Sequence, residues 1–264
     1  MLKLRTKTLL SKLTWLIIPA VLFWSLSFAG KQSAKLQCNG LRVELLPKQD
    51  KASFLNEAKI LTLANVPAGE ILTQTDVNNL DVKAMESALQ NNPYIKDAQV
   101  YLDINGKLNI RVAQNMPLIR VFKNNNSGYY ITEDGFKMPL SNEYSARVIV
   151  ASGNITESYT PGNDSLTTQV LKELYDLVKL IIRDPFLREM IDQIVVSRKK
   201  EFMLIPKLGN QKILFGNYQH ADYKLERLKL FYFKAIPQVG WKKYQVINLK
   251  YNGKIVCEKS NETE

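Results

Sequence analysis

The stretch from Asn92 to Val112 narrows the possible folds of this chain more than any other. It reads NPYIKDAQVYLDINGKLNIRV, in which a proline that stops a helix precedes two runs of alternating apolar and polar residues. Between the runs, Asn105-Gly106 supplies the positive φ angles of a two-residue type I′ turn. The pattern predicts an antiparallel hairpin with one apolar face, formed by Val100, Leu102, Ile104, Leu108, Ile110 and Val112.

Two short helices and one strand are predicted before this hairpin. Ser53 and Asp81 are the expected N-caps of the helices, which end at Pro67-Ala68-Gly69 and at Asn91-Asn92-Pro93. Their apolar faces are Phe54, Leu55, Ala58 and Leu61 in the first helix, and Val82, Met85, Ala88 and Leu89 in the second. The strand carries Leu41, Val43 and Leu45. This order of elements predicts two helices packed on one face of a three-stranded sheet.

The remainder of the chain is predicted to form mostly strands, interrupted by two helices. Apolar runs bounded by turn signals indicate strands at residues 118–122, 129–132, 147–151, 201–205 and 213–215. Glu133-Asp134-Gly135 is interpreted as a turn. Helical spacing predicts helices over residues 170–182, before Asp184-Pro185, and over residues 222–233. The chain closes on a second predicted hairpin around Asn252-Gly253, with Ile247, Leu249 and Tyr251 before the turn and Ile255 and Cys257 after it.

The run from Leu13 to Gly30 carries no charge and is about 27 Å long as a helix, close to the hydrocarbon thickness of a bilayer. Basic residues precede it at Lys3, Arg5, Lys7 and Lys12, so the positive-inside rule places the N-terminus in the cytoplasm. The sequence therefore predicts a single membrane span with the bulk of the chain exported. A cleaved signal peptide is the alternative, because Ser27-Phe28-Ala29 ends in small residues.

The net charge of +11 includes four positive charges in the predicted tail and leaves +7 on the exported part. Such a charge favours anionic partners, but export argues against nucleic acid and leaves anionic lipid or wall polymer open. The compact run Arg198-Lys199-Lys200 is interpreted as a solvated face. Cys38 and Cys257 lie far apart in sequence, and we expect both to be free thiols.

The sequence offers no candidate residues for an enzyme. His220 is the single histidine, and no Gly-x-Ser-x-Gly elbow, Cys-x-x-Cys pair, phosphate loop or dinucleotide fingerprint occurs. His220 is therefore interpreted as a surface or capping residue, and no metal or cofactor is expected. The sequence leaves open an active site made of carboxylates that only the fold brings together, as in a membrane-tethered hydrolase or transferase without a recognised motif.

Four motifs in order give the chain a family resemblance. They are NPYIKDAQVYLDINGKLNIRVAQNMPLIRVF, YYITEDGFKMPLS, GNQKILFG before KLERL, and QVINLKYNGKIV. Behind a basic tail and one apolar span, this arrangement resembles the bacterial division protein family FtsQ/DivIB over almost the whole chain. The resemblance implies an α+β fold with these parts: a cytoplasmic tail 1–12, a transmembrane helix 13–30, a small POTRA-like βααββ domain 36–115, a mostly antiparallel β domain with flanking helices 116–259, and a disordered tail 260–264.

The resemblance also implies a non-enzymatic scaffold of the divisome at the division septum. Such a protein is single-pass in the cytoplasmic (inner) membrane, with its bulk periplasmic or extracytoplasmic. The expected partners are FtsB/DivIC-like and FtsL-like single-span division proteins, together with the septal peptidoglycan synthase FtsW and its transpeptidase. Membrane lipid is contacted through residues 13–30, and no nucleic acid is expected.

In the family, a partner adds a strand along the terminal strand of the β domain, which implies a partner site at Lys250, Tyr251 and Gly253. An exposed aromatic beside an open sheet edge buries a large area at little entropic cost, which supports Tyr251 independently. The alternative is that Tyr251 is a core aromatic, because it alternates with Ile247 and Leu249.

A POTRA-type chaperone or assembly factor for exported polypeptides is the alternative function. Such proteins usually carry repeated modules and a membrane barrel, and the sequence shows neither. The division scaffold is therefore the preferred hypothesis.

Overall fold

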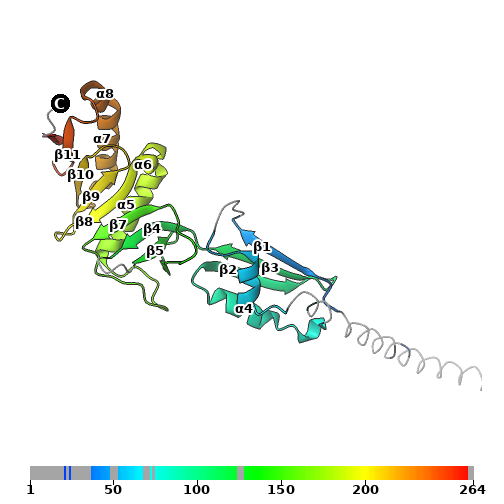
Figure 1. Cartoon of the computed structure of the whole chain (residues 1–264). Coiled ribbons are helices and arrows are strands. Elements are labelled where there is room, and N and C mark those ends of the chain that lie inside the picture. Colours follow the sequence, from blue (N-terminus) through cyan, green and yellow to red (C-terminus); the bar gives the residue numbers. More distant parts are fainter. Residues whose placement is uncertain are drawn as a thin grey trace, which may run out of the picture. The chain divides into compact units, whose positions relative to one another are not determined.

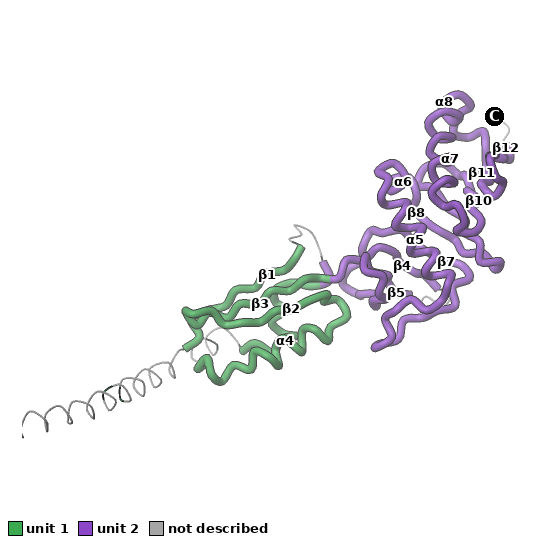
Figure 2. The backbone as a smooth tube through the Cα atoms, turned by 180° about the vertical axis from the view of Figure 1, so that it is seen from behind, with its two compact units in different colours: residues 1–51, 55–114 green, residues 52–54, 115–264 purple. Residues whose placement is uncertain are grey.

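The computed structural model describes residues 37–47, 53–67, 72, 75–123 and 128–260, together with Val21 and Trp24. The chain divides into two compact units (Figure 2): residues 1–51 and 55–114 form unit 1, and residues 52–54 and 115–264 form unit 2. Within the described residues, no helix has the length and apolar character needed to cross a membrane. The predicted tail 1–12, all but two residues of the predicted span 13–30, and residues 261–264 lie outside the described residues.

Unit 1 has the predicted order of elements (Figure 1). Its three strands are β1 (Leu41–Leu46), β2 (Ile95–Leu102) and β3 (Leu108–Gln114), in the sheet order β1-β3-β2. β3 pairs in parallel with β1 and antiparallel with β2. Two helices, α2 (Glu57–Leu63) and α4 (Val82–Gln90), and the 3-10 turn η2 (Val77–Asn79) lie between β1 and β2 in the chain. The buried residues of the sheet and helices include Ile60, Met85, Leu89, Ala98, Val100, Leu108, Ile110 and Val112.

The cap predicted for α4 is confirmed, and the cap predicted for α2 is wrong. The Asp81 carboxylate accepts a hydrogen bond from the Ala84 amide at 2.9 Å. The N-cap of α2 is Asn56, not Ser53, and its side chain accepts from the Lys59 amide at 2.8 Å. The helix starts at Glu57, so Phe54 and Leu55, which the prediction placed on its apolar face, are buried in the chain before it.

The hairpin of β2 and β3 is confirmed, but its predicted two-residue type I′ turn is wrong. Leu102 pairs with Leu108, and the Gly106 amide donates to the carbonyl of Asp103 at 3.0 Å. Gly106 has a φ of +76°, whereas Asn105 is not among the residues with positive φ. This is a three-residue loop with glycine in the left-handed position. Ile104 lies at its tip and is 95% exposed, so it does not share the apolar face.

Unit 2 is built on one mixed sheet of nine strands. Its order is β12-β11-β10-β9-β8-β7-β4-β5-β6. The pairs β4–β7, β7–β8 and β10–β11 are parallel and the other five are antiparallel. The strands are β4 (Pro117–Phe122), β5 (Gly128–Thr132), β6 (Lys137–Pro139), β7 (Ile149–Gly153), β8 (Ile191–Val196), β9 (Phe202–Pro206), β10 (Lys212–Gly216), β11 (Tyr244–Asn248) and β12 (Val256–Lys259).

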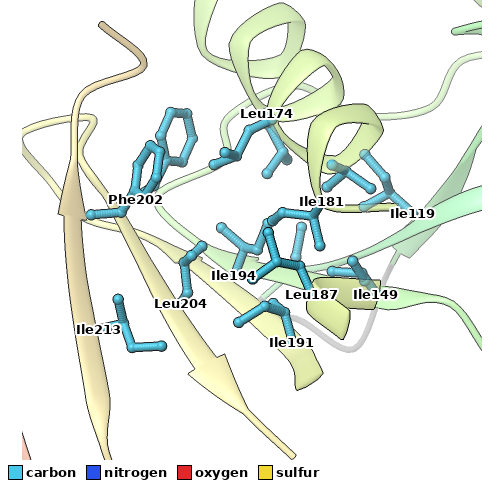
Figure 3. Close-up of a cluster of buried hydrophobic side chains, with 14 of the residues drawn as sticks. Ile119, Ile149, Leu174, Ile181, Leu187, Ile191, Ile194, Phe202, Leu204 and Ile213 are labelled. Atoms are coloured by element: carbon cyan, nitrogen blue, oxygen red, sulfur yellow. The ribbon is translucent and has the colours of Figure 1, made fainter. Parts of the chain in front are cut away.

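Both helices predicted for this unit are confirmed, and they pack with the sheet around one core. The helices are α5 (Gln169–Arg183), α6 (Pro185–Met190), α7 (Ala221–Lys234) and the short α8 (Ile236–Val239). Asp184 caps α6 by accepting from the Phe186 amide at 2.9 Å, as its position before a proline favours. Figure 3 shows part of the core, where side chains from α5 and α6 meet apolar side chains of the sheet: Leu174, Ile181, Leu187, Ile191, Ile194 and Leu204.

The segment from Asn154 to Thr168 starts beside β8, where the Asn154 amide donates to the carbonyl of Val196, and reaches the outer side of β6 at Asp164 and Ser165. The Lys137 amide of β6 donates to the carbonyl of Asp164 at 2.6 Å, and Phe136 forms a bridge with Ser165. The Glu133-Asp134-Gly135 turn before β6 is confirmed, and Gly135 has a φ of +81°. This edge of the nine-stranded sheet is therefore partly covered by the chain itself.

A buried ion pair holds this covering segment. The Lys137 ammonium lies 3.0 Å from the Glu157 carboxylate, and their side chains are only 2% and 8% exposed. Glu157 also accepts from the Thr167 amide and from the amide and hydroxyl of Thr168. Burial alone would raise the pKa of Glu157, but the hydrogen bonds from Thr168, Thr167 and Lys137 outweigh it and lower the pKa to about 2.

Replacing Glu157 is expected to destabilise unit 2 and to change its response to acid. A carboxylate with a lowered folded-state pKa stabilises the fold above its ordinary value of 4.5, and this contribution is lost as the pH falls towards 2. Glu157→Gln should lower the free energy of unfolding at pH 7 by about 3 kcal/mol, because the Lys137 charge stays buried without its carboxylate. The difference from wild type should shrink below pH 4.5, as measured by urea unfolding at each pH.

Glu226→Gln, on the exposed surface of α7, is the matched control and should change stability by less than about 0.5 kcal/mol. If the free energies of unfolding of wild type and Glu157→Gln fell equally as the pH was lowered, the lowered pKa would not belong to Glu157.

Candidate partner-binding edge

β12 is the last strand of the nine-stranded sheet and pairs only with β11. Val256 of β12 is 44% exposed, while Cys257 is half-buried opposite Ile247. Within the described part of the chain, no strand lies beyond β12. Its outer backbone groups are therefore open to pairing with another polypeptide.

The predicted terminal hairpin is confirmed as a strand pair, but its strands end farther from Asn252-Gly253 than predicted. β11 ends at Asn248 and β12 begins at Val256, so residues 249–255 form a longer loop. Leu249 anchors the start of this loop: its side chain is 1% exposed, and its amide donates to the carbonyl of Leu214 at 2.9 Å. Lys250, Tyr251 and Gly253 all lie in the loop.

Tyr251 is 55% exposed, so the interpretation as a core aromatic is wrong. The alternation with Ile247 and Leu249 ends where the strand ends, and the ring leaves the buried face. The carbonyl oxygen of Tyr251 accepts a hydrogen bond from Arg227 of α7 at 3.3 Å, which ties the loop to the helix layer. The guanidinium of Arg227 also lies over the ring of Tyr223, 5.3 Å from its centroid.

Lys250 extends from the loop to the turn between β8 and β9. Its ammonium forms an ion pair with the Glu201 carboxylate, with N–O distances of 2.9 and 3.2 Å. A Cβ on Gly216 would lie 2.9 Å from the Cγ of Lys250, so a glycine at this position gives the lysine room to pass. Both charged side chains remain more than a third exposed, so the pair can be exchanged for another at little cost.

Gly253 has a φ of +69°, and a Cβ added to it would meet no atom within 4 Å. The loop therefore needs glycine at this position for its backbone conformation, not for space. A small cavity of about 120 Å³ lies beside the loop. It is lined by Val195, Glu201, Met203, Leu214, Gly216 and Lys250, among others.

Two ionisable side chains in or near β12, Cys257 and Tyr232, have shifted pKa values. Burial raises the pKa of the Cys257 thiol and that of the Tyr232 hydroxyl, so neither is a ready nucleophile at neutral pH. Cys38 and Cys257 are both free thiols. No cluster of three or more His, Cys, Asp or Glu side chains that could bind a metal occurs among the described residues, including 37–47, 53–67, 75–123 and 128–260. His220 is exposed at the start of α7 and makes no side-chain cap.

The structure brings Lys250, Tyr251 and Gly253 together in one loop beside the open edge. Sequence reasoning missed Glu201 and Arg227, which hold the loop from elements far away in the chain. Glu201 directly follows the basic run 198–200, and this opposite charge was the only sequence signal for an ion pair there. Arg227 lies in the KLERL motif, residues 224–228, but nothing in that motif indicates its contact with the backbone of Tyr251.

Two family models match this chain. The model described as "FtsQ/DivIB, C-terminal related" matches residues 116–258, which is more than half of the 264 residues. The model of a POTRA-like domain matches residues 36–113. No curated protein matches the chain.

Substitutions at two neighbouring loop positions should separate support of the fold from surface exposure. Leu249→Ala should lower the free energy of unfolding by about 2–5 kcal/mol, because it empties a buried site. Tyr251→Ala should change it by less than about 0.5 kcal/mol, because the ring is largely in solvent. Chemical denaturation of the two variants measures both values, and comparable losses would show that Tyr251 supports the core.

Proposed function

The chain belongs to the FtsQ/DivIB, C-terminal related family, and we propose on this basis that it is a non-enzymatic scaffold of the bacterial division machinery. The POTRA-like match in unit 1 supports the proposal, because the two matches together repeat the two-domain organisation expected of such a scaffold. The proposed domains are residues 36–115 and 116–259.

The observation that carries the proposal is the open edge of β12 with an exposed tyrosine and lysine beside it. A partner that adds a strand to β12 gains main-chain hydrogen bonds along the edge, and Tyr251 offers it an aromatic anchor. We assign this edge to FtsB/DivIC-like single-span proteins, with FtsL-like proteins in the same assembly. Through them the scaffold recruits and regulates the septal peptidoglycan synthase FtsW and its transpeptidase.

The positive charge of the loop and β12 sets a second requirement for the partner segment. Lys250, Lys254 and Lys259 are exposed along the loop and β12, whereas Glu258 is the one exposed acid among the described residues of that strand. An acidic residue of the partner can take the place of Glu201 at Lys250, because the existing pair is solvent-exposed. The partner segment is therefore proposed to be extended, partly apolar and acidic opposite Lys250.

The proposed location is the cytoplasmic membrane at the division septum. Residues 13–30 would anchor the chain, with residues 1–12 in the cytoplasm and both compact units outside it. Imaging of the tagged full chain in dividing cells of its host tests the location, and depletion of the chain tests the role. Septal enrichment and a division defect are expected. An even distribution over the envelope, with loss of exported proteins on depletion, would support the POTRA-type chaperone instead.

The variant Tyr251→Glu is expected to weaken co-purification with the FtsB-like partner by about tenfold or more. A charge placed at an exposed aromatic anchor removes apolar burial and adds repulsion towards an acidic segment, while the fold loses no core contact. Co-purification of the full chain with the tagged partner measures the loss. Tyr101→Glu, at a 43% exposed tyrosine of β2, is the matched control and should bind as wild type does. Equal binding by the Tyr251 variant would remove this residue from the site.

A further inference from the structure

The two outer strands of the unit 1 sheet, β1 and β2, are protected differently. Along β2, the Val100 amide donates to the Glu86 carboxylate of α4 at 2.9 Å, and the Ala98 carbonyl accepts from the Gln90 amide of α4 at 3.2 Å. Side chains of the helix therefore satisfy outward backbone groups of this edge. Such cover prevents another strand from pairing with β2.

β1 has no equivalent cover among the described residues. It pairs with β3 on one side, and no described strand lies on the other. The side chains of β1 are correspondingly less buried than those of β3. Leu41, Val43 and Leu45 are half-buried, whereas their paired residues on β3 are 1% exposed or less, namely Leu108, Ile110 and Val112. One more strand beyond β1 would complete the burial of this apolar row.

The sequence of β1 is complementary to itself in antiparallel register. When Leu-Arg-Val-Glu-Leu is paired with its own copy about Val43, Leu41 lies opposite Leu45 of the copy and Arg42 lies opposite Glu44. A two-fold interface requires this kind of self-complementarity. We propose that the open edge of β1 pairs with β1 of a second copy of this chain, joining two three-stranded sheets into one of six strands.

Charge on the polar face of the sheet supports the second copy as the occupant. Glu44 lies 3.3 Å from the Nε of Arg111 in its own chain, whereas Arg42 is exposed and forms no ion pair among the described residues. In the pair, each Glu44 lies between Arg111 of its own chain and Arg42 of the copy. Both ends of the interface then carry an opposite-charge pair, and no like charges face each other.

The interface is confined to one short strand, since Pro47 directly follows β1 and cannot donate a backbone hydrogen bond. Association is therefore weak and depends on concentration and ionic strength.

Charge exchange at β1 tests the proposal. The full chain, purified in detergent, is compared with Arg42→Glu, Glu44→Arg and the double exchange by sedimentation equilibrium over a concentration series. Each single variant places like charges opposite each other twice and should raise the dimer dissociation constant about tenfold. The double exchange, and an equimolar mixture of the two single variants, should restore the dimer. A monomeric wild type, single variants that dimerise as wild type does, or a double exchange that stays monomeric would overturn the proposal.

Hydrogen exchange of the wild-type chain gives a second measurement that does not depend on how the variants fold. Amides of β1 should exchange more slowly as the protein concentration rises, while those of β2 should not change. Exchange of β1 that is independent of concentration would overturn the proposal even if the variants lose stability through the lost Arg111 contact.

Discussion

The unpaired backbone N–H and C=O groups of the outer strands constrain much of this structure. Two open sheets have four edges, and an uncovered edge presents unpaired N–H and C=O groups to any polypeptide nearby. The chain covers part of two of them with its own residues: side chains of α4 bond to β2, and residues 164 and 165 pair beside the start of β6. The edges of β1 and β12 are left uncovered by the described residues. Each compact unit thus has one partly covered edge and one edge available for pairing.

Closing the β6 edge needs strong anchoring, because the covering segment has little regular structure of its own. The carboxylate of Glu157 supplies this anchoring by accepting three hydrogen bonds from Thr167 and Thr168 and pairing with Lys137. Since Thr168 is also the N-cap residue of α5, the same network connects the edge to the main helix of the core. The buried carboxylate of Glu157 therefore holds the residue that precedes the first turn of α5.

Periodicity predicted many elements of both units, because the apolar faces of α4, α5 and several strands repeat with the period of their structure. It missed the strands β6 and β8 and the short helix α6. The turns were predicted less well. Asn-Gly indicated the place of each hairpin, but Asp103 accepts amides of the first loop and Leu249 is buried in the second, so both loops are longer than two residues. Sequence reasoning named Lys250 and Tyr251 but missed Glu201 and Arg227, since contacts between residues far apart in the chain leave no local pattern.

These distant contacts matter because they hold the loop 249–255 beside the edge before any partner arrives. Arg227 fixes the backbone of Tyr251 from α7, and Glu201 holds the Lys250 ammonium from the β8–β9 turn. A loop ordered in advance loses less conformational entropy on binding, so more of the contact energy remains as affinity. Burial lowers the pKa of Lys224, and the negative charge of Glu201 only partly offsets this lowering. The ammonium of Lys224 donates to the backbone carbonyl and side-chain oxygen of Asn217 at 2.8 and 3.2 Å, so its hydrogen bonds do not depend on where Glu201 lies.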